Sequence, residues 1–558
     1  MRALVLAAAV LAAGPPLRAE DLSASSGTVG SVTFLRKNVF DPSVAGEDWW
    51  VFTAANRIHI LTRERVVRDE LLLLPGRPWD ALAAQETERN LRSRNFIRRA
   101  ELRSKPGPSG LLDLEVLTQD AWTLKPQMSV GTEGGDRYLI YGVEENNILG
   151  LGKTVSLYGA EVGSERRSEA RYADPRVWGT WFQLTGLYSK TRRGDEIGVL
   201  LERPFFSLDT DNSTRLAWTR TIQEDKLYDY GAEYSKFIRN THVTQLEWGF
   251  KAFQTESQTQ RARIGYELEK SWFDSEPETL PGSLPKDRTL SGPVAGWSIV
   301  RPDYIKETYI DRIKRVEDFN LGNEFSVRGG PALESWGSDK DRWKVSAMDQ
   351  QGLRLWEEAF LLGQAGIQGR LSGGLTENSL FYANLNFFDK LRRPFSQTLV
   401  GHLEYNATGR LDGENQILLG GNTGLRGYKN NSFAGTRSLL LNFEDRFFHD
   451  REWFHLLYLG GVAFVDTGCA SPGSLARGQW KTDVGFGVRV SPSRSASGGV
   501  LRIDLAYALN PGPGGSRWVL SLRGGQAFSI FNSANRRVLR RAEGAVSEEG
   551  AGTRLRRR

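Results

Sequence analysis

Residues 419–428 read LGGNTGLRGY, and five strand-like runs follow this glycine-rich stretch. Within the runs apolar and polar residues alternate, so that the apolar side chains of each strand face one side. The stretch is therefore expected to be a loop, and the chain after it to form consecutive β-strands. The five runs are Ser438–Phe447, Leu457–Asp466, Thr482–Val490, Val500–Leu509 and Trp518–Ile530.

The same alternation begins at Leu124, as in the run Phe381–Phe387, where Asn384 and Asn386 face away from the apolar residues. A soluble β-sandwich shows the same alternation, with the apolar face as its core. The strands here run about 9–13 residues, which suits a tilted bilayer crossing, whereas globular strands average about 5–6. A sheet in lipid must close, because an open edge would leave backbone groups unpaired. We therefore predict a transmembrane antiparallel β-barrel over residues 122–531, with roughly 16 to 20 strands and the uncertainty concentrated between residues 297 and 370.

Residues 20–121 show a mixed pattern that predicts a small α/β domain. Its strands and helices are expected in the order β-α-α-β-β, with Pro75-Gly76 between the helices. Residues 41–62 form an insertion that contains Trp49 and Trp50 and has no assigned role. The expected elements are a strand around Val32, Phe34 and Val39, helices over Arg65–Leu74 and Asp80–Phe96, and strands over Ile97–Arg103 and Leu111–Leu117.

Residues 1–19 have the three parts of a secretory signal peptide: Arg2, the apolar run Ala3–Ala13, and Leu17-Arg18-Ala19 before Glu20. The apolar run has 11 residues, whereas a spanning helix needs about 20. We expect cleavage after Ala19. The lone Cys469 cannot form an intrachain disulfide, so the exported chain must be held by hydrogen bonds and burial.

The formal net charge of +6 comes from the two ends of the chain. Residues 1–19 contribute +2 and residues 532–558 contribute +5, so residues 20–531 carry −1. This distribution argues against nucleic acid as a partner. Residues 532–558 are predicted to be a basic, disordered tail.

Taken together, the glycine-rich stretch and the five runs after it resemble the BamA/TamA outer-membrane protein assembly superfamily. In that family an (L/V)RG(F/Y) loop folds into the barrel lumen and is likewise followed by five strands; here the motif is Leu425, Arg426, Gly427 and Tyr428. The resemblance extends to residues 20–121, which are similar to a single periplasmic POTRA domain. Sixteen is the strand number that the resemblance implies.

The resemblance also implies that Arg426 pairs with Glu444 and Asp466. A guanidinium inside a lumen needs fixed acceptors, preferably carboxylates. Strand parity supports Glu444, because Leu441 and Phe443 point the other way, but it is ambiguous for Asp466, whose face Phe464 shares. The alternative is a solvated arginine in an exposed turn, which would explain the glycines equally well.

The last run resembles the C-terminal signal of such barrels in Arg523, Gly525, Phe528 and Ile530, although the 27 residues after Phe531 depart from it. Two further stretches, Asn146–Thr154 (NNILGLGKT) and Tyr172–Arg176 (YADPR), resemble the family's barrel. The first also imitates a phosphate-binding loop, but Asn147 stands where that loop needs its first glycine and a strand pattern follows.

Enzymatic motifs are not found: the chain has no GxSxG elbow, and its five histidines show neither HExxH nor metal-ligand spacing. We predict no catalytic residues, no metal and no cofactor. The predicted function is outer-membrane protein assembly or polypeptide translocation, in which the POTRA domain receives the client and the seam between first and last strands inserts it.

The implied partners are unfolded outer-membrane client proteins and outer-membrane lipids, with a periplasmic or inner-membrane accessory protein as a further candidate. The expected location is the outer membrane of a Gram-negative bacterium, with the POTRA domain and the C-terminal tail in the periplasm. The alternatives are a passive porin-like channel and a secretion pore for a single client.

Overall fold

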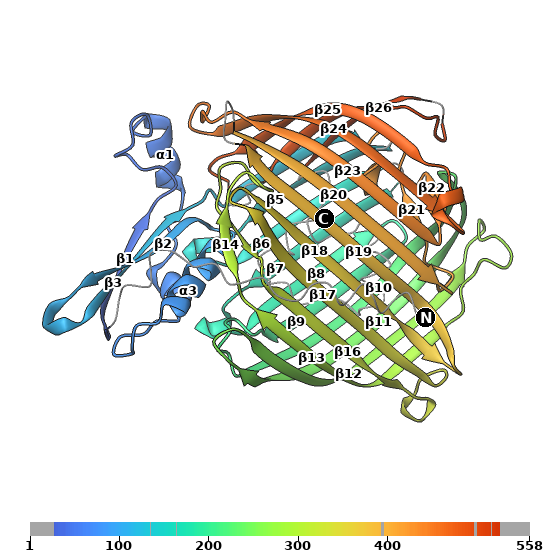
Figure 1. Cartoon of the computed structure of the whole chain (residues 1–558), viewed down its shortest axis with the longest axis horizontal. Coiled ribbons are helices and arrows are strands. Elements are labelled where there is room, and N and C mark those ends of the chain that lie inside the picture. Colours follow the sequence, from blue (N-terminus) through green and yellow to red (C-terminus); the bar gives the residue numbers. More distant parts are fainter. Residues whose placement is uncertain are drawn as a thin grey trace.

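The computed structural model describes residues 27–133, 136–162, 165–391, 396–495, 499–514 and 516–524. These residues form an N-terminal α/β domain and a large β-barrel, and Figure 1 shows the domain at one end of the barrel. The predicted signal peptide and the predicted basic tail lie outside the described residues. Among the described helices, none combines the length and the apolar character that a membrane crossing requires.

The N-terminal domain is built on a three-stranded sheet in the order β1-β3-β2. Strand β1 runs parallel to β3, and β2 runs antiparallel to it. Leu91 of the longest helix packs with Val67, Ile97 and Val116 in the domain core. The elements are β1 (Val29–Lys37), α1 (Trp50–Ile58), α2 (Glu64–Arg68), α3 (Ala81–Ser93), β2 (Ile97–Pro106) and β3 (Leu112–Asp120).

The expected β-α-α-β-β order is wrong in one respect, because the domain has three helices. The additional helix α1 lies in the insertion, where Phe52 is buried in a stack on Phe40 with ring centroids 4.4 Å apart. Helix α2 is shorter than predicted, because the chain after Arg68 leaves the helix and buries Leu71 and Leu73 in the core. Helix α3 begins where Asp80 accepts hydrogen bonds from the amides of Leu82 and Ala83.

In the part of the chain that the structure describes, the barrel is a closed antiparallel sheet of twenty strands, in which β27 lies beside β4. The predicted number of sixteen is therefore wrong. Sixteen was the number that the resemblance implied, whereas the strand count from alternation gave a range that reached twenty. The wall strands are β4 (Leu124–Glu133), β5 (Asp136–Glu145), β6 (Thr154–Val162), β7 (Glu165–Asp174), β8 (Gln183–Thr191), β9 (Gly194–Arg203), β10 (Asn212–Asp229), β11 (Ala232–Gln254), β12 (Thr259–Ser275), β13 (Arg288–Arg301), β16 (Asn323–Ala332), β17 (Arg342–Trp356), β18 (Ala359–Ser372), β19 (Leu375–Leu391), β20 (Ser396–Gly409), β23 (Arg437–Phe448), β24 (Leu457–Ser471), β25 (Lys481–Pro492), β26 (Leu501–Ala508) and β27 (Trp518–Gly524).

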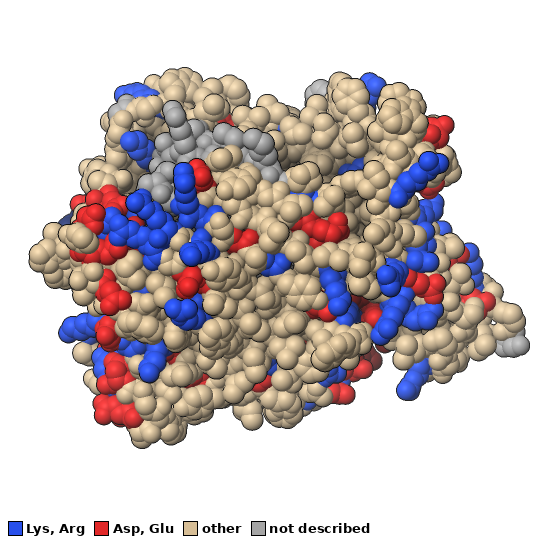
Figure 2. Space-filling model, turned by 180° about the vertical axis from the view of Figure 1, so that it is seen from behind, with Lys and Arg blue, Asp and Glu red and all other residues tan. Residues whose placement is uncertain are grey.

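Opposite faces of the wall differ in polarity, as β11 and β12 show. Leu246 pairs with Tyr266, and both are exposed on the outer side. One residue along the strands, Gln245 pairs with Glu267, and both are buried on the inner side. An apolar outer face and a polar lumen are the arrangement of a barrel in a bilayer. On the face seen in Figure 2, basic side chains are interspersed with acidic ones and large uncharged areas lie between them.

Two long connections leave the wall and carry small hairpins. The near segment, residues 302–322, follows β13 at the end of the barrel that bears the N-terminal domain, which we call the near end (Figure 1). The far loop, residues 410–436, follows β20 at the opposite, far end (Figure 1). Their hairpins are β14 (Tyr304–Glu307) with β15 (Glu317–Asn320), and β21 (Ile417–Leu419) with β22 (Phe433–Gly435).

Short 3-10 turns complete the fold. They are η1 (Pro108–Gly110), η2 (Ile148–Gly150), η3 (Val177–Gly179), η4 (Glu334–Trp336), η5 (Gly421–Thr423) and η6 (Leu475–Arg477).

Candidate functional site

Arg426 lies in the far loop and is 2% exposed, so the alternative of a solvated arginine does not describe this residue. Its Nε and Nη2 atoms donate to the two carboxylate oxygens of Asp466, each at 2.7 Å. Its Nη1 atom donates to Oε1 of Glu444 at 2.6 Å. The guanidinium carbon lies 3.5 Å from the ring centroid of Phe464. The structure thus brings together the three charged residues that the sequence analysis grouped, and Phe464 shares the inner face with Asp466.

Two glycines allow the loop to reach this position. Gly424 has a φ of +110°, a conformation that L side chains rarely adopt. Its carbonyl accepts a hydrogen bond from Nδ2 of Asn442 at 2.7 Å. Gly427 passes close to β25, where a Cβ atom would lie 2.5 Å from Cβ of Asp483. Both glycines therefore serve backbone geometry at the point where the loop meets the wall.

The remaining motif residues pack the loop onto the inner wall. Leu425 is fully buried and joins Leu419 and Leu440 in an apolar cluster. Tyr428 belongs to the same cluster, and its hydroxyl lies 3.0 Å from the carbonyl oxygen of Thr482 and 3.1 Å from that of Asn510. Apolar packing and fixed hydrogen bonds thus surround the ionic contacts of Arg426.

Residues that the sequence analysis did not assign extend the charged cluster. Asp504 of β26 lies 3.9 Å from Nη1 of Arg426 and is hydrogen-bonded to Arg489. Arg446 donates from Nε to Oε2 of Glu444 at 2.7 Å. Strand parity places Arg446 on the same face as Glu444, two residues away, so the alternation contained a signal for it.

The far loop has a second attachment on other strands of the wall. Asp412 accepts a hydrogen bond from Arg370 of β18 and forms an ion pair with Arg288 of β13 at 3.1 Å, and Glu414 accepts a hydrogen bond from Arg288 at 2.8 Å. The side-chain amide of Gln416 exchanges two hydrogen bonds with the backbone of Tyr228 in β10. Because β10, β13 and β18 lie on a different part of the wall from β23 and β24, the loop crosses the lumen.

The near segment enters the barrel from the other end and is held mainly by apolar packing. Ile310 is fully buried and packs with Phe319, Phe360 and Phe388, of which the last two come from the inner faces of β18 and β19. Ile313 packs in a second cluster with Phe448 and Tyr458. These inner faces are apolar where most of the lumen is polar, because the near segment covers them.

One carboxylate links the far loop to the near segment. Arg426 donates to Oε1 of Glu444, and Arg446 donates to Oε2 of the same group. Arg446 also donates from Nη1 to the carbonyl oxygen of Ile310 at 2.7 Å. Three hydrogen bonds in series therefore join the far loop to the near segment.

The near segment also contacts the N-terminal domain through charged groups. Arg92 of α3 donates to both carboxylate oxygens of Asp318, at 2.6 and 3.0 Å. Lys306 lies 2.8 Å from Glu88, and Arg315 donates to the carbonyl oxygen of Ile97 at 2.8 Å. A displacement of the domain would therefore act directly on the segment that enters the lumen.

The two stretches that resemble the family's barrel form hydrogen bonds with the N-terminal domain. Asn147, in NNILGLGKT, donates to the hydroxyl of Thr62 at 2.9 Å. Arg176, in YADPR, donates to both oxygens of Glu70, at 2.7 and 3.1 Å. Burial opposes ionisation of Glu70, but Arg94 and Arg176 hold the pKa of this carboxyl below its ordinary value.

The predicted C-terminal signal is only partly described. Arg523 lies in β27, and Gly525, Phe528 and Ile530 lie outside the described residues. The described part of β27 pairs with β26 over Trp518–Gly524, whereas β10 and β11 pair from Asn212 to Asp229. The described pairing beside the closing seam is thus much shorter than that in the long-stranded part of the wall.

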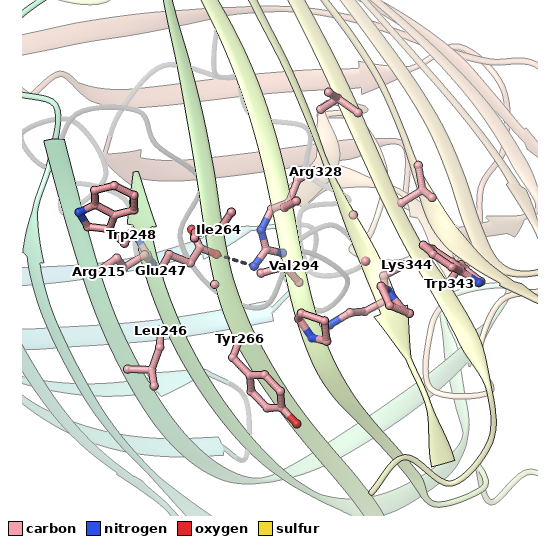
Figure 3. Close-up of a pocket in the computed structure, with 18 of the residues that line it drawn as sticks. Arg215, Leu246, Glu247, Trp248, Ile264, Tyr266, Val294, Arg328, Trp343 and Lys344 are labelled. Atoms are coloured by element: carbon pink, nitrogen blue, oxygen red, sulfur yellow. Dashed lines mark hydrogen bonds and ion pairs between the residues drawn. The ribbon is translucent and has the colours of Figure 1, made fainter. Parts of the chain in front are cut away.

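A hollow of about 1040 Å³ lies in the wall between β10 and β17. Figure 3 shows its lining, with Trp248 on β11, Tyr266 on β12 and Trp343 on β17, and a dashed line marks the Glu247–Arg328 ion pair. The exposed lining side chains are apolar and face outward, so the hollow belongs to the outer face of the wall.

One group of side chains among the described residues has the composition of a metal site. Ligand atoms of Glu47, Glu452 and His455 lie within 4.8 Å of one another. Arg494, however, donates from Nη2 to Glu47 at 2.6 Å and to Glu452 at 3.0 Å. The guanidinium supplies the positive charge that a cation would bring, and the group acts as a contact between the domain and the barrel.

Comparison with solved structures finds similarity to BamA from Haemophilus ducreyi lacking POTRA domains 1–3, at 12% identity and a TM-score of 0.37, over 89% of this chain and 84% of that one. CdiB from Acinetobacter baumannii and CdiB from Escherichia coli each have 11% identity and a TM-score of 0.45. The aligned regions cover 90% and 89% of this chain, and 74% and 76% of the two CdiB chains. No family model matches the chain, and no curated protein matches it either. Membership of the BamA/TamA superfamily therefore stays a prediction.

Proposed function

We propose that this protein is a non-enzymatic factor of the Gram-negative outer membrane that assembles or translocates other polypeptides. The observation that carries the proposal is that two connections enter the lumen from opposite ends and are joined there, with Arg426 of the far loop linked through Glu444 and Arg446 to the near segment. A passive porin needs an open lumen, and two connections that occupy part of it oppose steady conduction. A factor that handles polypeptides needs a pore that stays closed until a client arrives.

In this proposal the N-terminal domain is a periplasmic POTRA domain that receives unfolded outer-membrane clients. An extended client segment would add to a sheet edge of the domain through backbone hydrogen bonds. The contact between Arg92 and Asp318 supports a route from the occupied domain to the near segment. The last strand would form the opening seam, since Gly524 provides no side chain for packing there.

Depletion of the protein followed by quantitative proteomics of the outer membrane tests the proposal. Loss of several unrelated barrels supports an assembly factor, and loss of one secreted protein supports a pore for a single client. An unchanged outer membrane would contradict both. Planar-bilayer recordings add a second test: the protein is expected to conduct rarely, and a large, steady conductance would favour a passive channel.

A further inference from the structure

Helix α1 presents an apolar face that no described residue covers. Trp50 and Ile58 are 73% and 72% exposed, and Val51 lies beside them on the same face. Trp49, just before the helix, is also exposed. The opposite face carries Phe52, which is buried. Two exposed tryptophans form an apolar surface that is unfavourable in water, so this face is expected to bind a partner.

Both ends of the segment that carries α1 are fixed to the barrel. Before the helix, Glu47 is paired with Arg494, which lies in the turn between β25 and β26. After it, the amide of Arg63 donates to the carbonyl of Gly150, in the turn between β5 and β6. These turns lie on opposite sides of the junction between β27 and β4. The orientation of the exposed face relative to the wall is therefore set by the fold.

Three turns at the near end show the same unusual feature. Leu149, Trp178 and Phe454 each have a φ of 54° and are 57%, 89% and 75% exposed. A left-handed backbone at a bulky residue costs on the order of 1–3 kcal/mol and persists only where the surrounding structure enforces it, as at functional sites. Each turn thus combines backbone strain with an exposed apolar side chain at one end of the barrel.

The apolar turns continue the outer face of the wall. Val143 and Leu157 are register partners on β5 and β6, next to the turn that carries Leu149, and both are exposed on the outer side. Tryptophan and other amphipathic side chains gather where a membrane meets water. Arg57 is exposed at the edge of the apolar face of α1, and a cation at that position suits lipid phosphates.

We propose that α1 is a membrane-interface anchor of the N-terminal domain. Trp49, Trp50 and Ile58 enter the headgroup region of the leaflet at the near end, together with the apolar turns. The anchor holds the domain in a fixed orientation beneath the junction of β27 and β4. The proposal rests on the barrel spanning a bilayer and not on the activity proposed above.

The test uses the full chain in nanodiscs of phosphatidylethanolamine and phosphatidylglycerol. Cys469→Ser removes the single native cysteine, and Trp50→Cys then accepts a polarity-sensitive nitrobenzoxadiazole dye. Ile58→Cys is a second site on the same face. Leu111→Cys is the control, since the connection of β2 and β3 lies at the end of the domain away from the barrel (Figure 1). Heat-modifiable migration establishes that each variant is folded.

The dye at residues 50 and 58 is expected to emit at shorter wavelength than the dye at residue 111 and to be quenched by lipids spin-labelled near the headgroup. Emission and quenching equal to those of the control would overturn the proposal. A short-wavelength emission without quenching by spin-labelled lipid would also overturn it, because the face would then be covered by protein.

Discussion

The two connections that enter the lumen differ in which interaction dominates their attachment. The far loop is held at Arg426 by buried carboxylates, Asp466 and Glu444. The near segment is held mainly by apolar packing around Ile310, and its ion pairs join Asp318 to Arg92 of the N-terminal domain and Glu307 to Lys390 of the wall. The first arrangement depends on every charged partner being present, since one unpaired buried charge is very costly. The second loses stability in proportion to the apolar surface removed.

This difference suggests a division of roles. The far loop is attached at one precise geometry, which suits a permanent anchor. The near segment has a softer attachment and direct contact with the domain, which suits a part that moves when a client binds. Perturbing each connection separately should therefore give different results, and four measurements examine this difference.

The largest effect is expected for Arg426→Ala. The substitution leaves Asp466 buried without its guanidinium partner and leaves Glu444 with Arg446 alone, which costs about 3–5 kcal/mol. The unfolding midpoint in urea should fall strongly, heat-modifiable migration should be lost in part, and complementation of a deletion should decrease. Arg426→Lys should recover little, because an ammonium cannot reproduce the two-pronged contact with Asp466.

Arg477→Ala is the matched control for that experiment, because Arg477 is an exposed arginine at the far end of the barrel. Its substitution should change stability by less than about 0.5 kcal/mol. Equal behaviour of the Arg426 and Arg477 variants would refute the role of the far loop as an anchor.

A smaller effect is expected for Ile310→Ala in the near segment. Truncation of a buried isoleucine costs about 2–3 kcal/mol here, in the lower part of the usual range because a connection can relax around the gap. The barrel should stay folded, but single-channel recordings should show more frequent openings. Val316→Ala, at an exposed position of the same segment, is the control and should leave the recordings unchanged. Openings that are no more frequent with Ile310→Ala would argue against a movable near segment.

The near segment should also respond to pH through Glu317. Burial and the neighbouring Asp311 raise the pKa of this carboxyl from 4.5 to about 7. The protonated form therefore stabilises the segment: its contribution is complete below about pH 4.5 and is lost as the pH rises through about 7. The effect should be moderate, because the amides of Asp311 and Arg312 donate to the carboxylate.

Limited proteolysis within residues 302–322 measures this response. Cleavage should become faster as the pH rises from about 5.5 to about 8, because Glu317 loses its proton across this range and the segment loses the stability that the protonated form provides. Glu317→Gln should remove the pH dependence while Arg477→Ala retains it. A pH dependence that survives Glu317→Gln would assign the response to another group.

The smallest effect is expected for Arg92→Ala at the contact between the domain and the near segment. The side chains of this pair with Asp318 are 11% and 15% exposed, so its loss should cost about 1.5–2 kcal/mol of stability, less than the loss of a fully buried pair. Barrel folding should be unchanged, but hydrogen exchange of residues 302–322 should increase. Exchange that stays at the wild-type rate would mean that the domain and the near segment move independently.

Much of the barrel could be predicted from alternation, because a strand at a membrane places every second side chain in lipid. The five strands after residue 428 are found as predicted, from Arg437–Phe448 to the described part of β27. The predicted strand number was wrong because sixteen was taken from the resemblance and not from the number of alternating runs. The near segment lies between residues 297 and 370, where the alternation was ambiguous. Its apolar residues repeat as strands do, and periodicity does not distinguish a wall strand from a hairpin inside the lumen.

The sequence by itself determined the closed antiparallel sheet, the α/β domain before it and the grouping of Arg426 with two acidic residues. These features depend on local periodicity or on short motifs. Only the tertiary structure decided that Arg446 reaches Ile310 and that the segment carrying α1 is attached on both sides of the junction of β27 and β4. These contacts join residues that are far apart in the sequence, and their partners are selected by the closure of the barrel, which no local pattern encodes.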